Sequence, residues 1–317
     1  MVRIKVLGNF QRLSGLEFEY EPGFTFVCDP SCADYDWLVV FDELPVSRVE
    51  LACSPSQTIL CTWEPVTIKS YSRRYTRQFG HLLTNRPPEA EGHPHYHLGR
   101  GYFPQFVSSL PSSSEEILAA KREQISTVCS SKRMRHTQHN ARFELISALA
   151  RAIPGFSWYG HGVRPLEKKE DALLPYRYHV AVENHIAANH WTEKLSDPIL
   201  CECLTFYAGD PEIGEVLPPE AIIRIPIDDP QEAVKIIRAA IADGAYEKHR
   251  SAVLEAKRLI VTKYNLWAQV IAVVKSASSQ ALSDRPRRVI YSRKDLRWHD
   301  PAAALEDVWL HLKRGFK

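Results

Sequence analysis

The chain has 317 residues, of which 44% are hydrophobic and 25% charged, and its formal net charge is only +2. This is the composition of an ordinary globular protein, and so small a charge gives no general reason to expect a nucleic-acid-binding protein. Because the length exceeds the roughly 250 to 300 residues of a usual single core, two domains are expected.

Compartment is indicated by the cysteines and by the apolar segments. The seven cysteines are odd in number, and several lie inside apolar runs, so we expect reduced core residues of a cytosolic protein. The start, Met1 to Gly8, is expected to be a strand and lacks the apolar core of a signal peptide. No stretch approaches the roughly twenty apolar residues that span a bilayer. A cytoplasmic location is therefore expected.

In the first part of the chain, apolar runs alternate with turn-rich segments. Pro65–Gly80, dense in Tyr and Arg, predicts a helix, and Asn85–Phe106 predicts a loop. Asp34-Tyr35-Asp36 formally spells the metal-holding D-x-D motif, but it precedes a strand and is interpreted as a solvated approach. The expected strands are Ile4–Leu7, Trp37–Phe41, Thr58–Thr62 and Leu82–Thr84.

Three histidines at alternate positions, His93, His95 and His97, stand in the expected loop. On a strand they would share one face and could bind a metal, although Gly92 and Pro94 argue against a regular strand. Imidazole and aromatic side chains also suit contacts with a sugar, made here by His95, Tyr96 and His97. A plain surface loop is the third interpretation. We expect these residues to contact a sugar and not a metal.

The second part of the chain alternates strands with helices, which is typical of a parallel sheet covered by helices. Ser113 and Glu116 form a capping box for a short helix at Pro111–Gln124, and Asp228-Asp229-Pro230 is expected to cap a helix at Gln231–Ala242. The other expected elements are strands at Ile125–Ser130 and Phe156–Gly160 and helices at His139–Ala152 and Lys168–Leu174.

The most informative stretch is Pro175–Gly209. An apolar strand ends at Glu183-Asn184, Thr192 is expected to cap a helix that begins at Glu193, and Leu204–Tyr207 is a further strand before a glycine turn. Ligands collect beyond the carboxyl ends of such strands, and helix N-termini bind anions. Lys194 could supply a cation to a nucleotide diphosphate and Glu193 could accept from ribose hydroxyls. The plainer interpretation is an exposed first turn and a polar loop.

These residues resemble the signature of glycosyltransferase family 10, the α-1,3/4-fucosyltransferases. The signature here is Tyr178-His179-Val180-Ala181-Val182-Glu183-Asn184, then His190 six residues on, then Trp191-Thr192-Glu193-Lys194, with Thr205–Gly209 and Leu217–Ile223 continuing the likeness over about fifty residues. The resemblance implies a bacterial type without membrane anchor. It also implies an α/β chain of GT-B fold, with two Rossmann-like domains facing a cleft. The expected domains are 1–124 for acceptor binding, 125–280 for GDP-sugar binding, and a basic tail and helix at 281–317.

The resemblance further implies an inverting transfer of fucose from GDP-fucose to a glycan, expected to be a bacterial surface polysaccharide or lipopolysaccharide. No cofactor is required. The carboxylate base would be Glu64, in Cys61-Thr62-Trp63-Glu64-Pro65, where the alternative is that Glu64 only caps the helix expected from Pro65. The donor site would comprise Arg142, Glu183, Asn184, His190, Glu193 and Lys194.

Two positions depart from the family pattern. Asn140 stands where bacterial relatives usually have an arginine, so Arg142, Arg133 and Arg135 compete for the diphosphate, and His190 replaces a frequent tyrosine. Another GDP-sugar donor therefore stays open. The compact N-terminal half and its unusual loop also leave open a non-catalytic sugar-nucleotide or glycan-binding protein. The basic tail suits either peripheral contact with an anionic membrane or a packed helix with a solvated basic face. A nucleic-acid partner is not expected.

Overall fold

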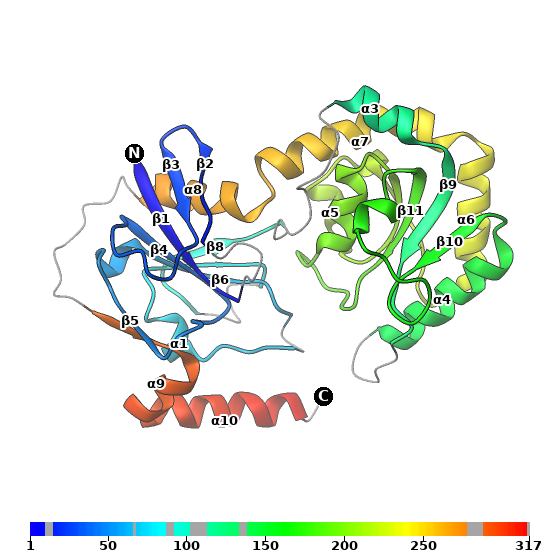
Figure 1. Ribbon diagram of the computed structural model, residues 1–317. Helices are drawn as coiled ribbons and strands as arrows, with labels where there is room; N and C mark the ends of the chain where they lie inside the picture. The colour runs from blue at the N-terminus through cyan, green and yellow to red at the C-terminus, as the bar shows by residue number, and fades with distance from the viewer. Residues whose placement is uncertain are drawn as a thin grey trace. The chain divides into compact units, whose positions relative to one another are not determined.

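A computed structural model of the chain describes residues 1–9, 15–65, 68–86, 92–101, 113–132, 138–277 and 288–315, the last of these mainly as backbone from residue 311 on. The chain forms two compact units (Figure 1). Unit 1 comprises Met1–Gly99 and Trp267–Lys317, and unit 2 comprises Arg100–Leu266. These boundaries differ from the expected ones at 124 and 280, because the last helices and the basic tail return to the first unit.

Unit 1 is built on a seven-stranded sheet in the order β2-β3-β1-β4-β6-β7-β8, in which only β2 runs antiparallel to its neighbour. The four expected strands are confirmed as β1, β4, β6 and β7. The strands are β1 (Val2–Leu7), β2 (Glu17–Glu21), β3 (Phe24–Val27), β4 (Trp37–Phe41), β6 (Thr58–Thr62), β7 (His81–Thr84) and β8 (Tyr96–Leu98).

Two expectations for unit 1 are wrong. The helix expected over Pro65–Gly80 is only one turn, α1 (Arg73–Thr76), and the loop expected from Asn85 contains β8. The segment buries two consecutive residues, Tyr71 and Ser72, as well as Tyr75. It therefore does not present the single apolar face that a long amphipathic helix requires.

The C-terminal segment completes the core of unit 1. Strand β14 (Val289–Tyr291) pairs antiparallel with β5 (Arg48–Glu50), and α9 (Arg293–His299) and α10 (Pro301–Gly315) follow it. Ile290, Leu296 and Ala303 are buried in the same cluster as Leu38 and Leu60. Further along the sheet, Trp267 of α8 (Leu266–Ala277) packs its ring 4.8 Å from that of Phe26. The tail is thus partly a packed element.

Unit 2 has the expected parallel sheet covered by helices. Its strand order is β10-β9-β11-β12-β13, all parallel. Leu145, Leu149 and Ile199 of the helices are buried against Val180 and Phe206 of the strands. The strands are β9 (Glu123–Val128), β10 (Phe156–Tyr159), β11 (Tyr176–Val182), β12 (Leu204–Ala208) and β13 (Ile222–Arg224).

The helices of unit 2 agree with the caps expected from the sequence. The Ser113 side chain accepts from the backbone N–H of Glu116, and the Asp229 side chain accepts from that of Glu232. Only a 3₁₀ turn, Lys169–Ala172, forms where a short helix was expected. The helices are α3 (Ser114–Ala120), α4 (His139–Ala152), α5 (Glu193–Leu200), α6 (Pro230–Ala242) and α7 (Ala245–Thr262). Within the described ranges, none of the chain's helices combines the length and the apolar character needed to cross a bilayer.

Candidate functional site

The polar residues of the Pro175–Gly209 stretch meet at the carboxyl edge of the unit 2 sheet. Val182 is paired with Ala208, and the backbone N–H of Glu183 donates to the carbonyl of Ala208 at 2.9 Å. The ends of β11 and β12 are therefore level with each other. Helices α4 and α5 begin near this edge, as the hydrogen bonds of Glu183 and Asn184 with residues of their first turns show below.

Glu183 is the centre of a hydrogen-bond network. It is fully buried, and its carboxylate accepts from the backbone N–H of Thr192 at 2.9 Å and from the Thr192 hydroxyl at 2.9 and 3.0 Å. The hydroxyl of Thr192 also accepts from the backbone N–H of Lys194 at 3.3 Å and so caps α5, as expected. Glu183 thereby fixes the start of the helix that carries Glu193 and Lys194.

Lys194 lies between two carboxylates. Its ammonium is 2.9 Å from an oxygen of Glu193 and 3.8 Å from one of Glu183. Burial lowers the pKa of Lys194, but the two carboxylates outweigh burial, so the pKa is raised above its usual value. Burial favours the neutral form of Glu193, yet Lys194 and Lys169 bring its pKa down to about 2. At neutral pH the site therefore holds a lysine cation and an ionised Glu193.

Burial affects Glu183 differently, because it raises the pKa of this carboxyl more than Lys194 and Thr192 lower it. Three hydrogen bonds from Thr192, rather than bonds from solvent, satisfy the buried carboxyl group of Glu183. Loss of those bonds would leave a buried carboxyl group with Lys194 as its main partner. The network is thus a support that holds Lys194 in place.

Arg142 extends the same site from the first turn of α4. Its guanidinium donates to the side-chain oxygen of Asn184 and, at 3.3 Å, to the sulfur of Cys129 at the end of β9. The carbonyl of Asn184 accepts from the backbone N–H of Gln138 at 3.2 Å. The Nε of Arg142 is buried and has no hydrogen-bond partner among the described residues. A buried N–H donor without a partner, next to a lysine site, suits an oxyanion ligand.

His190 occupies the loop between β11 and α5. Its side chain is buried, and its ring lies 5.5 Å from that of His185 in an edge-to-face arrangement. Asn189 before it adopts a left-handed backbone with φ of 61°. The structure thus brings five of the six expected donor residues to this edge in two hydrogen-bonded groups, Glu183 with Glu193 and Lys194 around Thr192, and Asn184 with Arg142. It places His190 on the loop between β11 and α5. Arg133 and Arg135 lie outside the described residues.

One further residue of this edge, Asp210, was not expected from the sequence as part of the site. Asp210 is fully buried, its pKa is raised by burial, and its backbone N–H donates to the hydroxyl of Tyr207 at 3.1 Å. Gly209 stands between them, where an added Cβ would lie 2.1 Å from the Tyr207 hydroxyl and 2.7 Å from Glu183 Cγ. The Ala208-Gly209-Asp210 turn was visible in the sequence, but the close packing of its glycine depends on residues distant in the chain.

Glu64 follows β6 in unit 1 and is exposed. Its backbone carbonyl accepts from the guanidinium of Arg86 at 2.6 and 3.2 Å. Residues 66 and 67 lie outside the described residues, so the alternative that Glu64 caps a helix from Pro65 stays a prediction, and α1, further along the chain, is capped by Ser72. Arg86, itself buried, was not expected from the sequence and holds the backbone on which Glu64 stands.

The proposed acceptor residues His95, Tyr96 and His97 are also in unit 1. His97 Nε2 lies 3.1 Å from Nδ1 of His81, and the His95 ring lies 5.4 Å from the ring of His81. Burial, reinforced by the neighbouring imidazoles, lowers the pKa of His81 to about 4. No group of three or more His, Cys, Asp or Glu side chains in the described part of the chain is arranged to hold a metal ion.

Comparison with known proteins shows the fold. No family model and no curated protein sequence matches this chain. A crystal structure of an α1,3-fucosyltransferase with GDP shares 15% identity with it at a TM-score of 0.54, covering 90% of this chain and 93% of that one. A second α1,3-fucosyltransferase structure shares 14% identity at a TM-score of 0.53, covering 90% of this chain and 92% of that one. The expected GT-B class, a mixed α/β chain with parallel sheets, is therefore confirmed.

Proposed function

We propose that this protein is an inverting glycosyltransferase that uses a GDP-sugar, with GDP-fucose as the leading donor and a hydroxyl of a glycan as acceptor. The acceptor we infer is a bacterial surface polysaccharide or lipopolysaccharide. The observation that supports this most is the network at the edge of the unit 2 sheet, where Glu183 and Thr192 hold Lys194 and Asn184 holds Arg142. It stands on a GT-B fold, and one solved structure of that fold contains GDP.

In the proposed reaction, Glu64 takes the proton of the acceptor hydroxyl, and the acceptor oxygen attacks the anomeric carbon. The bond from that carbon to the β-phosphate oxygen breaks, and its electron pair leaves with GDP. Lys194 and Arg142 stabilise the negative charge that grows on the diphosphate, which is the type of interaction that gives the largest catalytic effects. Glu193 and Asn184 contact the ribose, and His190 lies near the donor. The scheme requires no metal or other cofactor.

Calorimetric titration with GDP, GDP-fucose, GDP-mannose and UDP tests the donor site. We expect GDP and at least one GDP-sugar to bind, and Lys194→Ala to weaken GDP binding by at least tenfold because a partly buried cation that would pair with the diphosphate is lost. Lys235→Ala is the matched control, since Lys235 is an exposed lysine on α6 of the same unit. Binding of UDP alone would refute the proposal, and an unchanged affinity in Lys194→Ala would remove Lys194 from the phosphate site.

The base is tested separately. We expect Glu64→Gln to bind GDP-fucose normally and to lose transfer by at least about 100-fold. Glu50→Gln, at an exposed glutamate of β5 in the same unit, should keep activity. Turnover only with another GDP-sugar would favour the alternative donor. Normal donor binding without turnover of any acceptor would favour the non-catalytic alternative.

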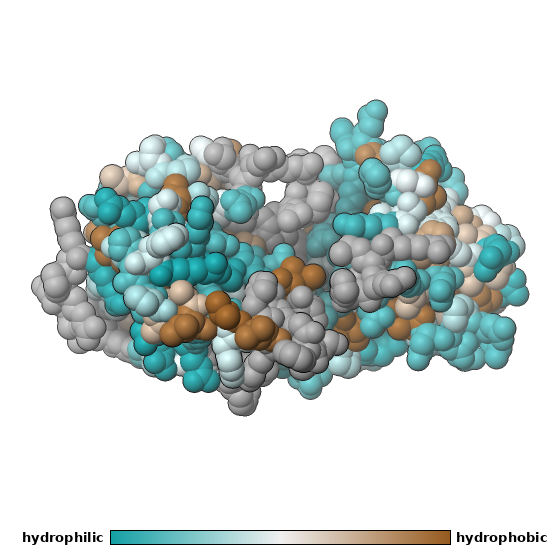
Figure 2. Space-filling view, turned by 90° about the horizontal axis from the view of Figure 1, so that it is seen from below, coloured by the Kyte–Doolittle hydropathy of each residue, from teal (hydrophilic) through white to brown (hydrophobic). Residues whose placement is uncertain are grey.

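We also propose peripheral contact with an anionic membrane through α10. Leu305, Val308, Trp309 and Leu312 follow a helical spacing and are all more than half exposed. Figure 2 shows apolar side chains aligned over this helix. Such an apolar stripe, on a helix whose last residues include Lys313 and Arg314, is typical of helices that lie on a membrane surface. Flotation with vesicles containing phosphatidylserine tests it, and equal recovery of wild type and Leu305→Glu/Leu312→Glu would contradict it.

A further inference from the structure

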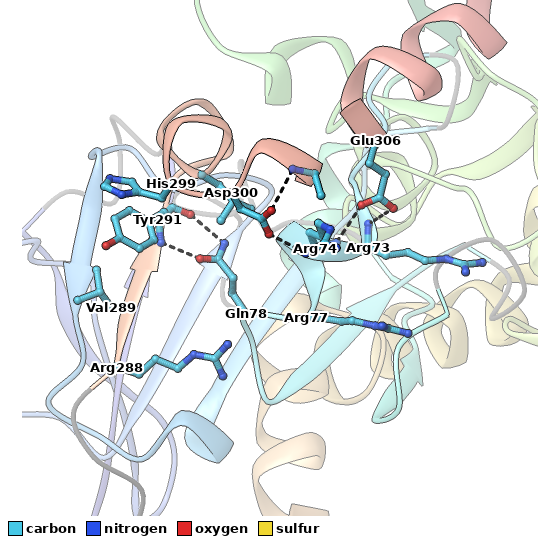
Figure 3. Close-up of a pocket in the computed structure, with 12 residues that line it drawn as sticks. Arg73, Arg74, Arg77, Gln78, Arg288, Val289, Tyr291, His299, Asp300 and Glu306 are labelled. Carbon is cyan, nitrogen blue, oxygen red and sulfur yellow. Dashed lines mark hydrogen bonds and ion pairs between the residues drawn. The ribbon is translucent and has the colours of Figure 1, made fainter. Parts of the chain in front are cut away.

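Unit 1 contains a cavity of about 770 Å³ that is lined by residues of α1, β14, α9 and α10. It lies within one unit, so its shape does not depend on the placement of the other. The lining includes Arg73, Arg74, Arg77 and Arg288, together with the acidic residues Asp300 and Glu306. Figure 3 shows these side chains around the cavity. Its volume is in the range of small-molecule sites.

The walls of the cavity are joined by polar contacts between segments that are distant in the sequence. Gln78 donates to the carbonyl of Tyr291 at 3.1 Å and accepts from its backbone N–H at 2.9 Å. Glu306 accepts from the backbone N–H groups of Arg73 and Arg74 at 2.8 and 3.2 Å. These contacts attach α1 to β14 and α10 (Figure 3). The arginines are thus presented by a fixed framework.

Only some of the charged side chains that line the cavity are paired with one another. Arg74 is paired with Asp300 at 2.8 Å, and Glu306 is occupied by backbone N–H groups. In the described part of the chain, nothing forms a hydrogen bond or an ion pair with the guanidinium groups of Arg77 and Arg288. Four arginines against two carboxylates leave an excess of positive charge in one cavity. Guanidinium groups bind phosphates and carboxylates through paired N–H donors.

The cavity is also lined by aromatic and apolar side chains. The ring centroids of Tyr291 and His299 are 4.2 Å apart, with the ring planes tilted by 31°, and Val289 and Leu296 also line the cavity. Aromatic rings present a face on which the C–H side of a pyranose can pack, while their polar ends stay available for hydrogen bonds. Inorganic anions make no use of such a surface. A sugar that carries an anionic group uses both parts of the lining.

We propose that this cavity binds a saccharide that carries phosphate or carboxylate groups, with Arg77 and Arg288 on the anionic groups and Tyr291 on the sugar ring. The saccharide can be a soluble glycan or the head group of a glycolipid. Its assignment as part of the acceptor rests on the proposed function, whereas its binding does not. If transfer requires an anionic part of the acceptor to bind in this cavity, only anionic glycans would be acceptors.

Binding is measured calorimetrically on the full chain with glucose 6-phosphate, a galacturonic acid trisaccharide, maltotriose and inorganic phosphate. We expect the two anionic saccharides to bind at least tenfold more tightly than neutral maltotriose and inorganic phosphate, and the affinity to fall as salt screens the charges. Arg77→Ala/Arg288→Ala should lose at least tenfold. Equal binding of inorganic phosphate and glucose 6-phosphate, or equal affinity of the variant, would overturn the proposal.

The control is Arg122→Ala/Arg151→Ala, which removes the same charge from exposed positions of unit 2. It should bind the anionic saccharides as the wild type does, and a loss equal to that of Arg77→Ala/Arg288→Ala would show a general charge effect and overturn the site. Vesicles with and without a phosphorylated glycolipid separate the two sources, because only the glycolipid vesicles should distinguish the variant from wild type. Binding to plain phosphatidylserine vesicles that depends on Arg77 and Arg288 would instead indicate a lipid site. GDP affinity should be unchanged in the variant, so failure here is distinct from failure of the donor site.

Discussion

Gly209 shows how closely the candidate donor site is packed around single residues. A methyl group at this position would overlap the hydroxyl of Tyr207, whose side chain is almost fully buried and cannot move away, and would press on Glu183. We expect Gly209→Ala to lower the free energy of unfolding by about 2 kcal/mol or more, through overpacking. Urea denaturation measures this.

The matched control is Gly214→Ala, five residues further along the chain. An added Cβ there meets nothing closer than Pro219 Cγ at 3.8 Å. Its free energy of unfolding should change by no more than about 0.5 kcal/mol. Equal stability of the two variants would mean that the Tyr207 ring relaxes and that the packing at Gly209 is not tight.

Among single residues, the sequence predicted the acidic and basic residues at the carboxyl edge of the unit 2 sheet but not the residues that support them. Glu183, Asn184, Glu193 and Lys194 were expected from their spacing along one strand and one helix. Arg142 was singled out by the resemblance, and its contact with Asn184 joins residues of two different elements. Asp210 and Arg86 were missed because their burial and hydrogen bonds come from contacts across the fold, which leave no local pattern. The functional roles of all these residues stay predictions.

Thr192 fixes the start of α5, because its hydroxyl forms hydrogen bonds with two partners. It caps the helix at Lys194 and donates to the buried carboxylate of Glu183. We expect Thr192→Val, which keeps the shape and removes the hydroxyl, to lose about 2 to 4 kcal/mol of unfolding free energy: about 1 for the cap and the rest for the carboxylate left short of a donor. Chemical denaturation monitored by circular dichroism measures this loss.

Thr192→Ser retains the hydroxyl and should recover most of that loss. If Val and Ser variants were equally stable, the hydroxyl would not be the group that matters. The Val variant should also weaken GDP binding under the proposed function, because Lys194 is placed by the same cap. If Thr192→Val is too unstable for calorimetry, the denaturation of Thr192→Val and Thr192→Ser is compared instead.

Elements with strong local patterns were predicted well. Strands β4 and β6 and helix α4 have the expected bounds, since each combines a regular period with clear ends. The β2–β3 hairpin was missed, although Glu17–Glu21 alternates polar and aromatic residues before Pro22-Gly23. Strand β8 and the β5–β14 pair were missed because each strand has only three residues and exists through its partner.

For the whole molecule, the division of the chain was the least predictable feature. A cut after residue 124 follows from the alternation of elements, but the compact units show that the last fifty residues belong with the first hundred. Ile290 and Leu296 carry ordinary apolar side chains, and only the structure shows which core they enter. Their local sequence, rich in arginine, indicated a tail.

This division predicts a selective effect of truncation. A chain that ends after Ala277 lacks β14, α9 and α10, and with them Ile290, Leu296 and Ala303 from the core of unit 1. The core of unit 2 is formed by residues between Ile125 and Ile260, all of which remain. Hydrogen exchange followed by mass spectrometry should therefore show lost protection in β4 and β6 but native protection in β9, β11 and β12. Loss of protection in both sheets would mean that the two units unfold as one, and native protection in both would mean that the C-terminal segment adds little to the unit 1 core.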